Sequence, residues 1–162
     1  MQLASRLRPF KPEDLEQVMD INQKCLPENY TPHFFIDLHK HFPAAFIVAE
    51  EKGRVVGYVM CRIEMGMPSL RLMGFERKGH VISIAVLPEH RRRGVAKALM
   101  REVMKAMLLY RAKECILEVR VNNKPAVNLY RKMGFQVTQK VRGYYSDGEA
   151  AYQMARKLPY ED

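Results

Sequence analysis

Apolar residues recur at helical spacing in some segments of the chain and at strand spacing in others, and each change of spacing marks a new secondary-structure element. In KPEDLEQVMDINQKCL, residues 11–26, apolar side chains recur near helical spacing after an early proline, a residue favoured in a first helical turn. Thr31 and a following proline repeat this start signal at PHFFIDLHKHF, residues 32–42. The pattern predicts two helices, with a short strand near Leu3–Arg8 before them.

From Ala44 onward the pattern becomes typical of strands. AFIVAE and VVGYVMCRIE, residues 45–50 and 55–64, are β-rich runs around the charged glycine turn EKGR, so they predict a hairpin. A loop rich in Gly, Met and Pro, residues 66–79, leads to HVISIAVL at 80–87. That nearly unbroken apolar run indicates a strand covered on both faces, and it ends at a proline.

A strand, a helix and a strand follow one another over residues 80–121. The helix has one apolar stripe, and CILEVRV, residues 115–121, reads as another buried strand. This predicts a β-α-β unit with a parallel pair, then a helix at 125–133 and strands within 135–145 and 150–158. The fold class is therefore α/β. The predicted stripe consists of Val95, Leu99, Val103, Ala106 and Tyr110.

The composition limits the classes of protein that remain. A chain of 162 residues, 48% hydrophobic and 28% charged, favours a single domain over residues 1–162. Its three cysteines are scattered without C-x-x-C spacing, so we expect no disulfide framework or zinc knuckle and a reducing, cytoplasmic location. No apolar run has the length of a signal peptide or of a membrane helix, so we expect no membrane partner.

The formal net charge is +9, which fits a nucleic acid, an anionic small molecule or simply a basic surface. The densest basic run is EHRRRGVAKALM, residues 89–100, where the predicted helix begins. Free amide N–H groups and the helix dipole favour an anion at such a start, and glycine lets the backbone approach closely. Arg91–Lys97 is therefore a candidate cradle for a diphosphate, the alternative being a solvated basic helix cap.

The same run resembles a known family, the GCN5-related N-acetyltransferases (GNAT), whose pyrophosphate loop reads Q/R-x-x-G-x-G/A. Arg91, Gly94 and Ala96 match that loop position by position. NKPAVNLYRKMGF, residues 123–135, also resembles the family signature N-x-x-A-x-x-L-Y-x-x-x-G-F. The resemblance implies the family's mixed, partly splayed sheet flanked by helices, and acetyl-CoA as co-substrate.

The family pattern implies a role for each matching position. The backbone of Ile84, Ala85 and Val86 would pair with the pantetheine arm, and an N–H near Val86 would meet the oxyanion. Tyr130 would protonate the coenzyme thiolate, the alternative being an aromatic ring packed on the sheet, and Asn123 would contact the coenzyme. The loop amides expected to hold the pyrophosphate are those of Arg92, Arg93, Gly94, Val95, Ala96 and Lys97.

A closer resemblance extends over most of the chain, from Arg8 to Leu158. Three segments are similar to catalytic subunits of protein N-terminal acetyltransferases, especially the RimI-like archaeal homologues of the NatA subunit: LPENY at 26–30, LEVRVNN at 117–123 and GYYSDGEAAYQM at 143–154. The resemblance implies a peptide entrance. Its lining would be Glu28, Tyr30, Arg120, Tyr144 and Tyr145, with Glu28 helping to select or deprotonate the amino-terminal residue.

Acetyl transfer needs a neutral amine, and this requirement points to a base. A peptide α-amine with a pKa of about 7.7 to 8.0 is roughly a sixth to a tenth neutral at pH 7, against about 0.04% for lysine. Glu118 and His80, on neighbouring strands, are the candidates, with Glu28 as a third. Alternatively, Glu118 and Arg120 form a structural ion pair. No cysteine has a base beside it, so direct attack in a ternary complex is expected, without a metal.

Other functions are compatible with parts of the sequence. A ribosomal-protein or lysine ε-acetyltransferase would have the same fold, and a catalytically silent acetyl-CoA sensor would share the loop. A basic nucleic-acid-binding module would instead bind RNA or DNA with steep salt dependence. For the N-terminal acetyltransferase, the expected partners are protein or nascent-chain amino termini, and the latter would bring the chain near the ribosome. No sequence-specific nucleic acid is expected, and the chain would act as a monomer or small oligomer.

Overall fold

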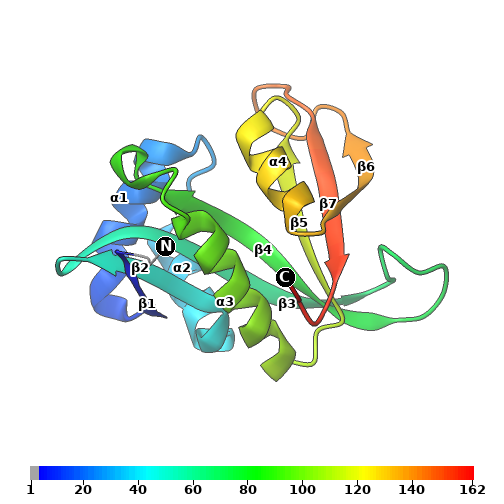
Figure 1. The fold of residues 1–162 in the computed structure, drawn as a ribbon, viewed down its shortest axis with the longest axis horizontal. Helices are drawn as coiled ribbons and strands as arrows, with labels where there is room; N and C mark the ends of the chain where they lie inside the picture. The colour runs from blue at the N-terminus through cyan, green and yellow to red at the C-terminus, as the bar shows by residue number, and fades with distance from the viewer. Residues whose placement is uncertain (1–3) are drawn as a thin grey trace.

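A computed structural model describes residues 4–162 of the chain. Leu3, the predicted start of the first strand, lies outside the described residues. The fold is a mixed α/β arrangement, which confirms the predicted class (Figure 1). Its elements are β1 (Arg6–Pro9), α1 (Leu15–Cys25), α2 (Pro32–His41), β2 (Phe46–Glu51), β3 (Arg54–Gly66), β4 (Glu76–Val86), α3 (Val95–Leu109), β5 (Glu114–Arg120), α4 (Lys124–Lys132), β6 (Gln136–Val141) and β7 (Ala151–Lys157).

Within residues 4–162, seven strands form one sheet in the order β1-β2-β3-β4-β5-β7-β6. All neighbours are antiparallel except β4 and β5, which are parallel. This pair is joined only from Lys78↔Glu114 to His80↔Ile116. Beyond His80 the two strands separate, so that β5, β7 and β6 lean away from β4 in Figure 1. The sheet is therefore splayed, as the family resemblance implied.

Helices cover the wide half of the sheet from both sides. In β3, Gly57 approaches Leu99 of α3, whereas the next side chain, Tyr58, contacts Asn22 of α1. Successive strand residues point to opposite faces, so α3 covers one face and α1 the other, with α2 beside α1 (Figure 1). The fourth helix, α4, lies beside β5 and β7.

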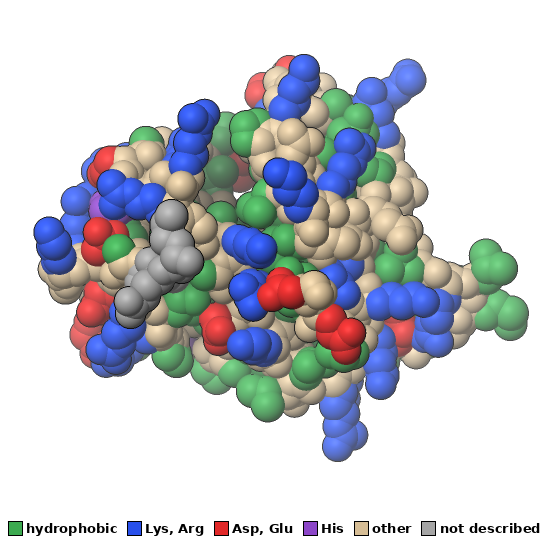
Figure 2. Space-filling view, viewed as in Figure 1, with side chains coloured by type: hydrophobic (Ala, Val, Ile, Leu, Met, Phe, Trp, Pro, Cys, Tyr) green, Lys and Arg blue, Asp and Glu red, His purple; other side chains and the backbone are tan. Residues whose placement is uncertain are grey.

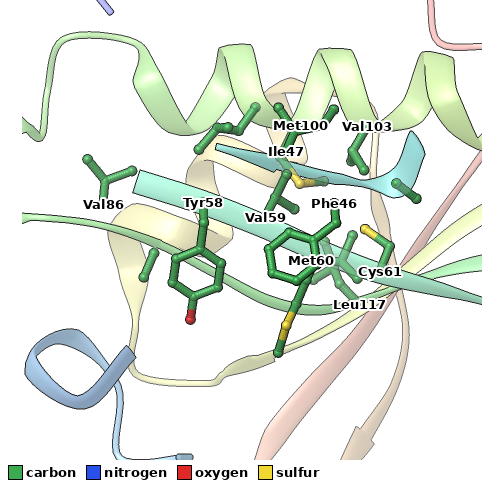
Figure 3. Packing of buried hydrophobic residues seen from close by; sticks show 14 of the residues in the cluster. Phe46, Ile47, Tyr58, Val59, Met60, Cys61, Val86, Met100, Val103 and Leu117 are labelled. Carbon is green, nitrogen blue, oxygen red and sulfur yellow. The ribbon is translucent and has the colours of Figure 1, made fainter. Parts of the chain in front are cut away.

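The core under α3 is rich in methionine. Figure 3 shows Met100 and Val103 of α3 over Ile47 and Val59 of the sheet. The predicted stripe of α3 was only partly correct. Its first three members are buried, but Ala106 and Tyr110 are only partly buried. Three methionines outside the predicted stripe complete the buried face: Met100, Met104 and Met107.

The structure corrects several predicted boundaries. The first helix segment divides into a 3₁₀ turn at Pro12–Asp14 and then α1. The hairpin of β3 and β4 is longer than predicted, because pairing continues outward to Gly66↔Glu76. The loop expected at 66–79 is therefore reduced to residues 67–75. Charged residues concealed these strand ends from the hydropathy pattern, since Glu64, Arg77 and Lys78 interrupt it.

Candidate active site

The splay between β4 and β5 opens a groove at the end of β4 that leads to α3. The register pairs β4 with β5 no further than His80, so Ile84, Ala85 and Val86 have no partner strand on that side. These are the three residues predicted to pair with an extended ligand arm. Figure 2 shows the surface hollowed between the loop before α3 and α4, with Lys and Arg side chains around it.

The loop before α3 has the backbone form that the motif predicts. Gly94 caps the helix at φ 81° and Arg92 also has a positive φ of 62°. A side chain at Gly94 would meet nothing within 4 Å, so the space above the loop is open. The positive φ values of Arg92 and Gly94 fold the loop tightly at the helix start, where free backbone N–H groups favour an anion.

The basic side chains of this loop do not all face the groove. The Arg91 Nε donates to the Val86 carbonyl at 2.8 Å, which ties the loop to the end of β4. His90 Nδ1 lies 3.0 Å from Glu51 Oε2, and an Arg93 nitrogen lies 3.8 Å from Glu51 Oε1. Part of the positive charge therefore holds the loop in place through its own protein contacts.

His80 and Glu118, the two predicted base residues, are in direct contact at the point where the strands separate. His80 Nε2 lies 2.6 Å from Glu118 Oε1, and the Gln153 side chain donates to Glu118 Oε2 at 3.1 Å. On the other side of the ring, His80 Nδ1 lies 2.6 Å from Glu64 Oε2. Glu64 also accepts from Arg62 Nε at 2.7 Å. A polar chain therefore crosses the strands β3, β4, β5 and β7.

These contacts shift the pKa values of His80, Glu118 and Glu64. Burial alone would lower the pKa of His80, but the hydrogen bonds and charges of Glu118 and Glu64 outweigh it, and its pKa is raised. Burial likewise would raise the pKa of Glu118, yet its contact with His80 lowers it. For Glu64, Arg62 and His80 outweigh burial in the same way and lower its pKa. These shifts favour a positively charged His80 between two negatively charged carboxylates.

The segment that contains Glu28 and Tyr30 is held by a buried asparagine. Asn22, which is 1% exposed, donates to the Glu28 carbonyl at 3.0 Å and accepts from the Tyr30 N–H at 3.3 Å. The same amide contacts the Tyr58 hydroxyl, which lies 2.7 Å from the hydroxyl of Ser83 on β4. This network fixes the turn between α1 and α2 against the sheet, next to the groove.

Arg120 joins the two loops at the opposite end of β5 from the sheet junction. It donates to Glu28 Oε1 at 2.7 Å and to both oxygens of Asp147, at 2.9 and 3.1 Å. Its guanidinium also lies over the Tyr145 ring, 4.1 Å from the centroid. The alternative of an ion pair between Arg120 and Glu118 is therefore wrong, because each has other partners.

Tyr144 and Tyr145 are in the loop between β6 and β7, whereas the sequence suggested a strand. Their rings pack edge to face with centroids 4.9 Å apart. Burial and then the charge of Glu118 raise the pKa of Tyr144 to about 12. Tyr30 is similarly influenced by burial, Glu28 and Glu118, which raise its pKa. The charge of Glu118 therefore acts on tyrosines of both loops.

Tyr130 and Asn123 both belong to α4 and its cap. Tyr130 is buried, packs edge-on against Phe135 with ring centroids 5.8 Å apart, and has its pKa raised by burial. Within residues 4–162 its hydroxyl has no hydrogen-bond partner. Asn123 caps the helix, since its side chain accepts from the Ala126 N–H at 3.3 Å. That cap is a local reason for asparagine at this position.

The sequence reasoning did not identify Asn22, Glu64, Asp147 or Gln153. Glu64 could have been suspected, because a glutamate near the end of an apolar strand needs a partner. The partner itself depends on the register between β3 and β4, which contains an irregularity between Met60 and Cys61. Asn22 reads as an ordinary polar residue of an amphipathic helix, so no signal in the sequence marked it.

Between Ala4 and Asp162, no group of three or more His, Cys, Asp or Glu side chains has an arrangement that could hold a metal ion. None of the helices in that span is both long and apolar enough to cross a membrane.

The similarity of the chain to known proteins agrees with the splayed sheet and the loop before α3. Residues 15–135 match the sequence profile of the acetyltransferase (GNAT) family. The chain is 50% identical over 155 residues to the N-alpha-acetyltransferase of Sulfurisphaera tokodaii, an alignment covering 94% of this chain and 93% of that relative.

Solved structures agree with this match. Ard1 of Thermoplasma volcanium superposes with a TM-score of 0.84 at 32% identity, covering 97% of this chain and 99% of that one. Naa20 of Chaetomium thermophilum, solved in complex with a bisubstrate analogue, gives 0.83 at 29% identity, covering 94% and 86%. From the profile match, the splayed sheet and the loop at the start of α3, the chain belongs to the GNAT acetyltransferase family.

Proposed function

We propose that the protein transfers an acetyl group from acetyl-CoA to the α-amine of protein amino termini. The observation that carries the proposal is the position of Glu118. It touches His80 where the sheet opens, and its charge acts on Tyr30 and Tyr144 from the two loops beside the groove. A proton acceptor therefore lies between a groove for an extended ligand and an entrance lined by tyrosines. The relatives named above, one of them an N-alpha-acetyltransferase, support this choice of reaction.

The residues at the groove fit acetyl-CoA. The free edge of β4 at Ile84, Ala85 and Val86 offers backbone groups to an amide-containing arm such as pantetheine. At the end of the groove, a Cβ at Gly94 would meet nothing within 4 Å, so the amides of Arg92 to Lys97 at this helix start are the proposed seat of a diphosphate. Bound there, acetyl-CoA would supply the thioester, and an N–H near Val86 is the proposed donor to the developing oxyanion.

Proton transfer is assigned to residues of the polar chain. The carboxylate of Glu118 accepts the proton of the attacking amine, and His80 orients that carboxylate through Nε2. The α-amine needs little help, because its pKa is near 8, so one carboxylate suffices. Tyr130 is the proposed donor to the departing thiolate, since its raised pKa keeps the hydroxyl protonated. No cysteine acts as a nucleophile in this proposal: Cys61 and Cys115 are buried and burial raises the pKa of each, and the partly buried Cys25 donates through Sγ to the Val86 carbonyl at 3.7 Å.

The peptide entrance lies between the α1–α2 turn and the β6–β7 loop. Arg120 connects the two by binding Glu28 on one and Asp147 on the other. We assign Glu28, Tyr30, Arg120, Tyr144 and Tyr145 to substrate binding. Glu28 also faces an incoming α-ammonium, which gives it a part in selecting the amino-terminal residue.

The cellular setting is part of the proposal. Amino termini arise on nascent chains, so a cytoplasmic enzyme of archaeal type working near the ribosome, as a monomer or small oligomer, fits the substrate. The formal charge of +9 supports proximity to an RNA-rich particle without sequence-specific binding. A lysine acetyltransferase of the same fold is the second candidate, which the basic loop alone does not exclude.

Two peptides of identical internal sequence test the proposal. One offers a free Ser or Met α-amine, and the other is blocked there and offers a lysine. Transfer of acetyl from acetyl-CoA to the first peptide only, reduced about a hundredfold or more in Glu118→Gln, is the expected result. Transfer to lysine only would refute the α-amine assignment, and coenzyme A binding by Glu118→Gln serves as the folding control.

A further inference from the structure

The proposed base consists of Glu118 and its partner His80, and it leaves the contact between Glu64 and His80 without a role. Both ring nitrogens of His80 lie 2.6 Å from a carboxylate oxygen, Nδ1 from Glu64 and Nε2 from Glu118. An ionised carboxylate only accepts hydrogen bonds, so each nitrogen must carry the proton of its contact. The ring is therefore an imidazolium with both protons engaged, and it has no free nitrogen to take a proton from substrate.

An imidazolium beside a single carboxylate would make that carboxylate a poor base. The positive charge of His80 lowers the proton affinity of Glu118, whereas the negative charge of Glu64 raises it again. With Glu64 present, Glu64, His80 and Glu118 together carry one net negative charge, and the positive charge of Arg62, whose side chain is 44% exposed, is screened by solvent. Without it, the pair of His80 and Glu118 would be neutral while the ring keeps its proton.

We propose that Glu64 is a positioning residue for acetyl transfer: it holds His80 through Nδ1 and balances the charge of the ring, so that Glu118 remains basic enough to accept the amine proton. The inference rests on the proposed function of the site. In the step, the C–N bond forms, the C–S bond breaks, and the proton of the amine nitrogen moves to a Glu118 oxygen. His80 keeps both protons and Glu64 stays ionised, and the thiolate takes its proton from Tyr130.

Among residues 4–162, the groups around His80 leave Glu64 as the one carboxylate that can balance the charge of the ring at Nδ1. From β3, Arg62 binds Glu64 at 2.7 Å, and from β5 Glu118 faces the other nitrogen. Gln153 of β7 is neutral. The hydroxyls of Tyr30 and Tyr144, from the two loops, have raised pKa values and stay protonated. No second carboxylate in residues 4–162 contacts the Nδ1 side of the ring.

Substitution Glu64→Gln keeps the shape of the side chain and removes its charge. In the variant, the pair of His80 and Glu118 is neutral while the ring keeps its proton and becomes negative only when His80 loses it. Glu118 then becomes a better base, so activity should recover as pH rises. We expect the ratio of wild-type to variant kcat/KM for the α-amine peptide to be about tenfold or more at pH 6, and to fall below about threefold at pH 9. Titration of the substrate amine is common to both proteins and cancels in this ratio.

A matched control is available in the neighbouring strand β2. Glu50 binds Arg8 Nε at 2.7 Å, as Glu64 binds Arg62 Nε, and it lies away from the groove. Glu50→Gln should leave the ratio near one at every pH. Glu64→Asp keeps the charge and should give a ratio that does not vary with pH. Nitrogen-15 spectra of the histidines should show both His80 nitrogens protonated at pH 7 in the wild type. In Glu64→Gln, His80 should lose its proton at a lower pH than it does in the wild type.

The outcomes separate this inference from the proposed function. A ratio that is constant from pH 6 to 9, or a neutral His80 in the wild type at pH 6, would overturn the role of Glu64 alone. Failure of the wild type to acetylate any α-amine peptide would overturn the proposed function and this inference with it. Acetylation by the wild type together with the expected change of ratio supports both.

Discussion

Gly79 is the residue on which the junction of β4 and β5 depends, and replacing it with alanine should strain the core. The glycine is one of three β4 residues paired with β5, directly before His80, and α3 crosses above it. A Cβ built there would lie 2.2 Å from Met107 Sδ, 2.6 Å from its Cγ and 2.7 Å from its Cε. Met107 has no exposed surface and must therefore move within a filled core.

The expected cost follows from the packing of that core. Overfilling a well-packed interior by one methyl group costs about 1 to 3 kcal/mol of unfolding free energy. For a chain of this size, 1 kcal/mol corresponds to about 2 to 4 °C in Tm, so Gly79→Ala should lower Tm by about 2 to 12 °C. Thermal unfolding followed by circular dichroism, with urea unfolding for the free energy, measures both quantities.

A control and a double variant make this prediction specific. At Gly66, in the same hairpin, the nearest atom to an added Cβ is Lys78 Cε at 3.9 Å, so Gly66→Ala should change stability by less than about 0.5 kcal/mol. Met107→Ala alone should cost about 2 to 5 kcal/mol. In Gly79→Ala with Met107→Ala the new methyl occupies vacated space, so the double variant should be more stable than the sum predicts. Wild-type stability in Gly79→Ala, or simple additivity, would refute the reasoning.

Three further predictions concern the groove and its walls. Asn22→Ala removes three hydrogen bonds, one buried and two partly buried, and should cost about 2 to 4 kcal/mol in urea unfolding. Replacing the exposed Asn128 with alanine should cost nothing, and equal stability of the two variants would contradict this. Gly94→Ala places a side chain at φ 81°, which costs about 1 to 2 kcal/mol of stability. The variant should also bind coenzyme A about tenfold more weakly, as measured by calorimetry. Unchanged affinity would argue against the loop of Arg91 to Lys97 as the diphosphate cradle. His80 has a raised pKa and Glu118 a lowered one, so their pair stabilises the fold most between about pH 4.5 and 6.5, less above the raised pKa and less below the lowered one. The stability difference between wild type and Glu118→Gln should therefore be larger at pH 6 than at pH 9.5, and a constant difference would contradict the assignment.

The parts of the fold that could be predicted are those encoded by local patterns. The loop of Arg91 to Lys97 is recognisable because the anion-binding geometry of a helix start needs glycine at a fixed spacing. The strand, helix and strand around it follow from apolar runs that end at Pro88 and the turn after α3. The predicted contact between neighbouring parallel strands placed His80 near Glu118, and the structure brings them together.

The parts that could not be predicted depend on partners distant in sequence. Arg120 is two residues from Glu118, and the sequence offered a local ion pair, but its partners Glu28 and Asp147 come from two separate loops. Glu64 reaches His80 only through the register of a long hairpin, 16 residues away. The buried face of α3 was misassigned for another reason: methionine fills irregular space, and three methionines widened the stripe beyond the predicted positions.

The central claim is that the acetyl group goes to an α-amine, and one competition experiment tests it most directly. A single peptide with a free amino-terminal serine and an internal lysine is incubated with acetyl-CoA and the wild-type protein, and the acetyl group is located by tandem mass spectrometry. We predict acetylation at the amino terminus, with lysine unmodified over the same time. Acetylation confined to the lysine would contradict the claim.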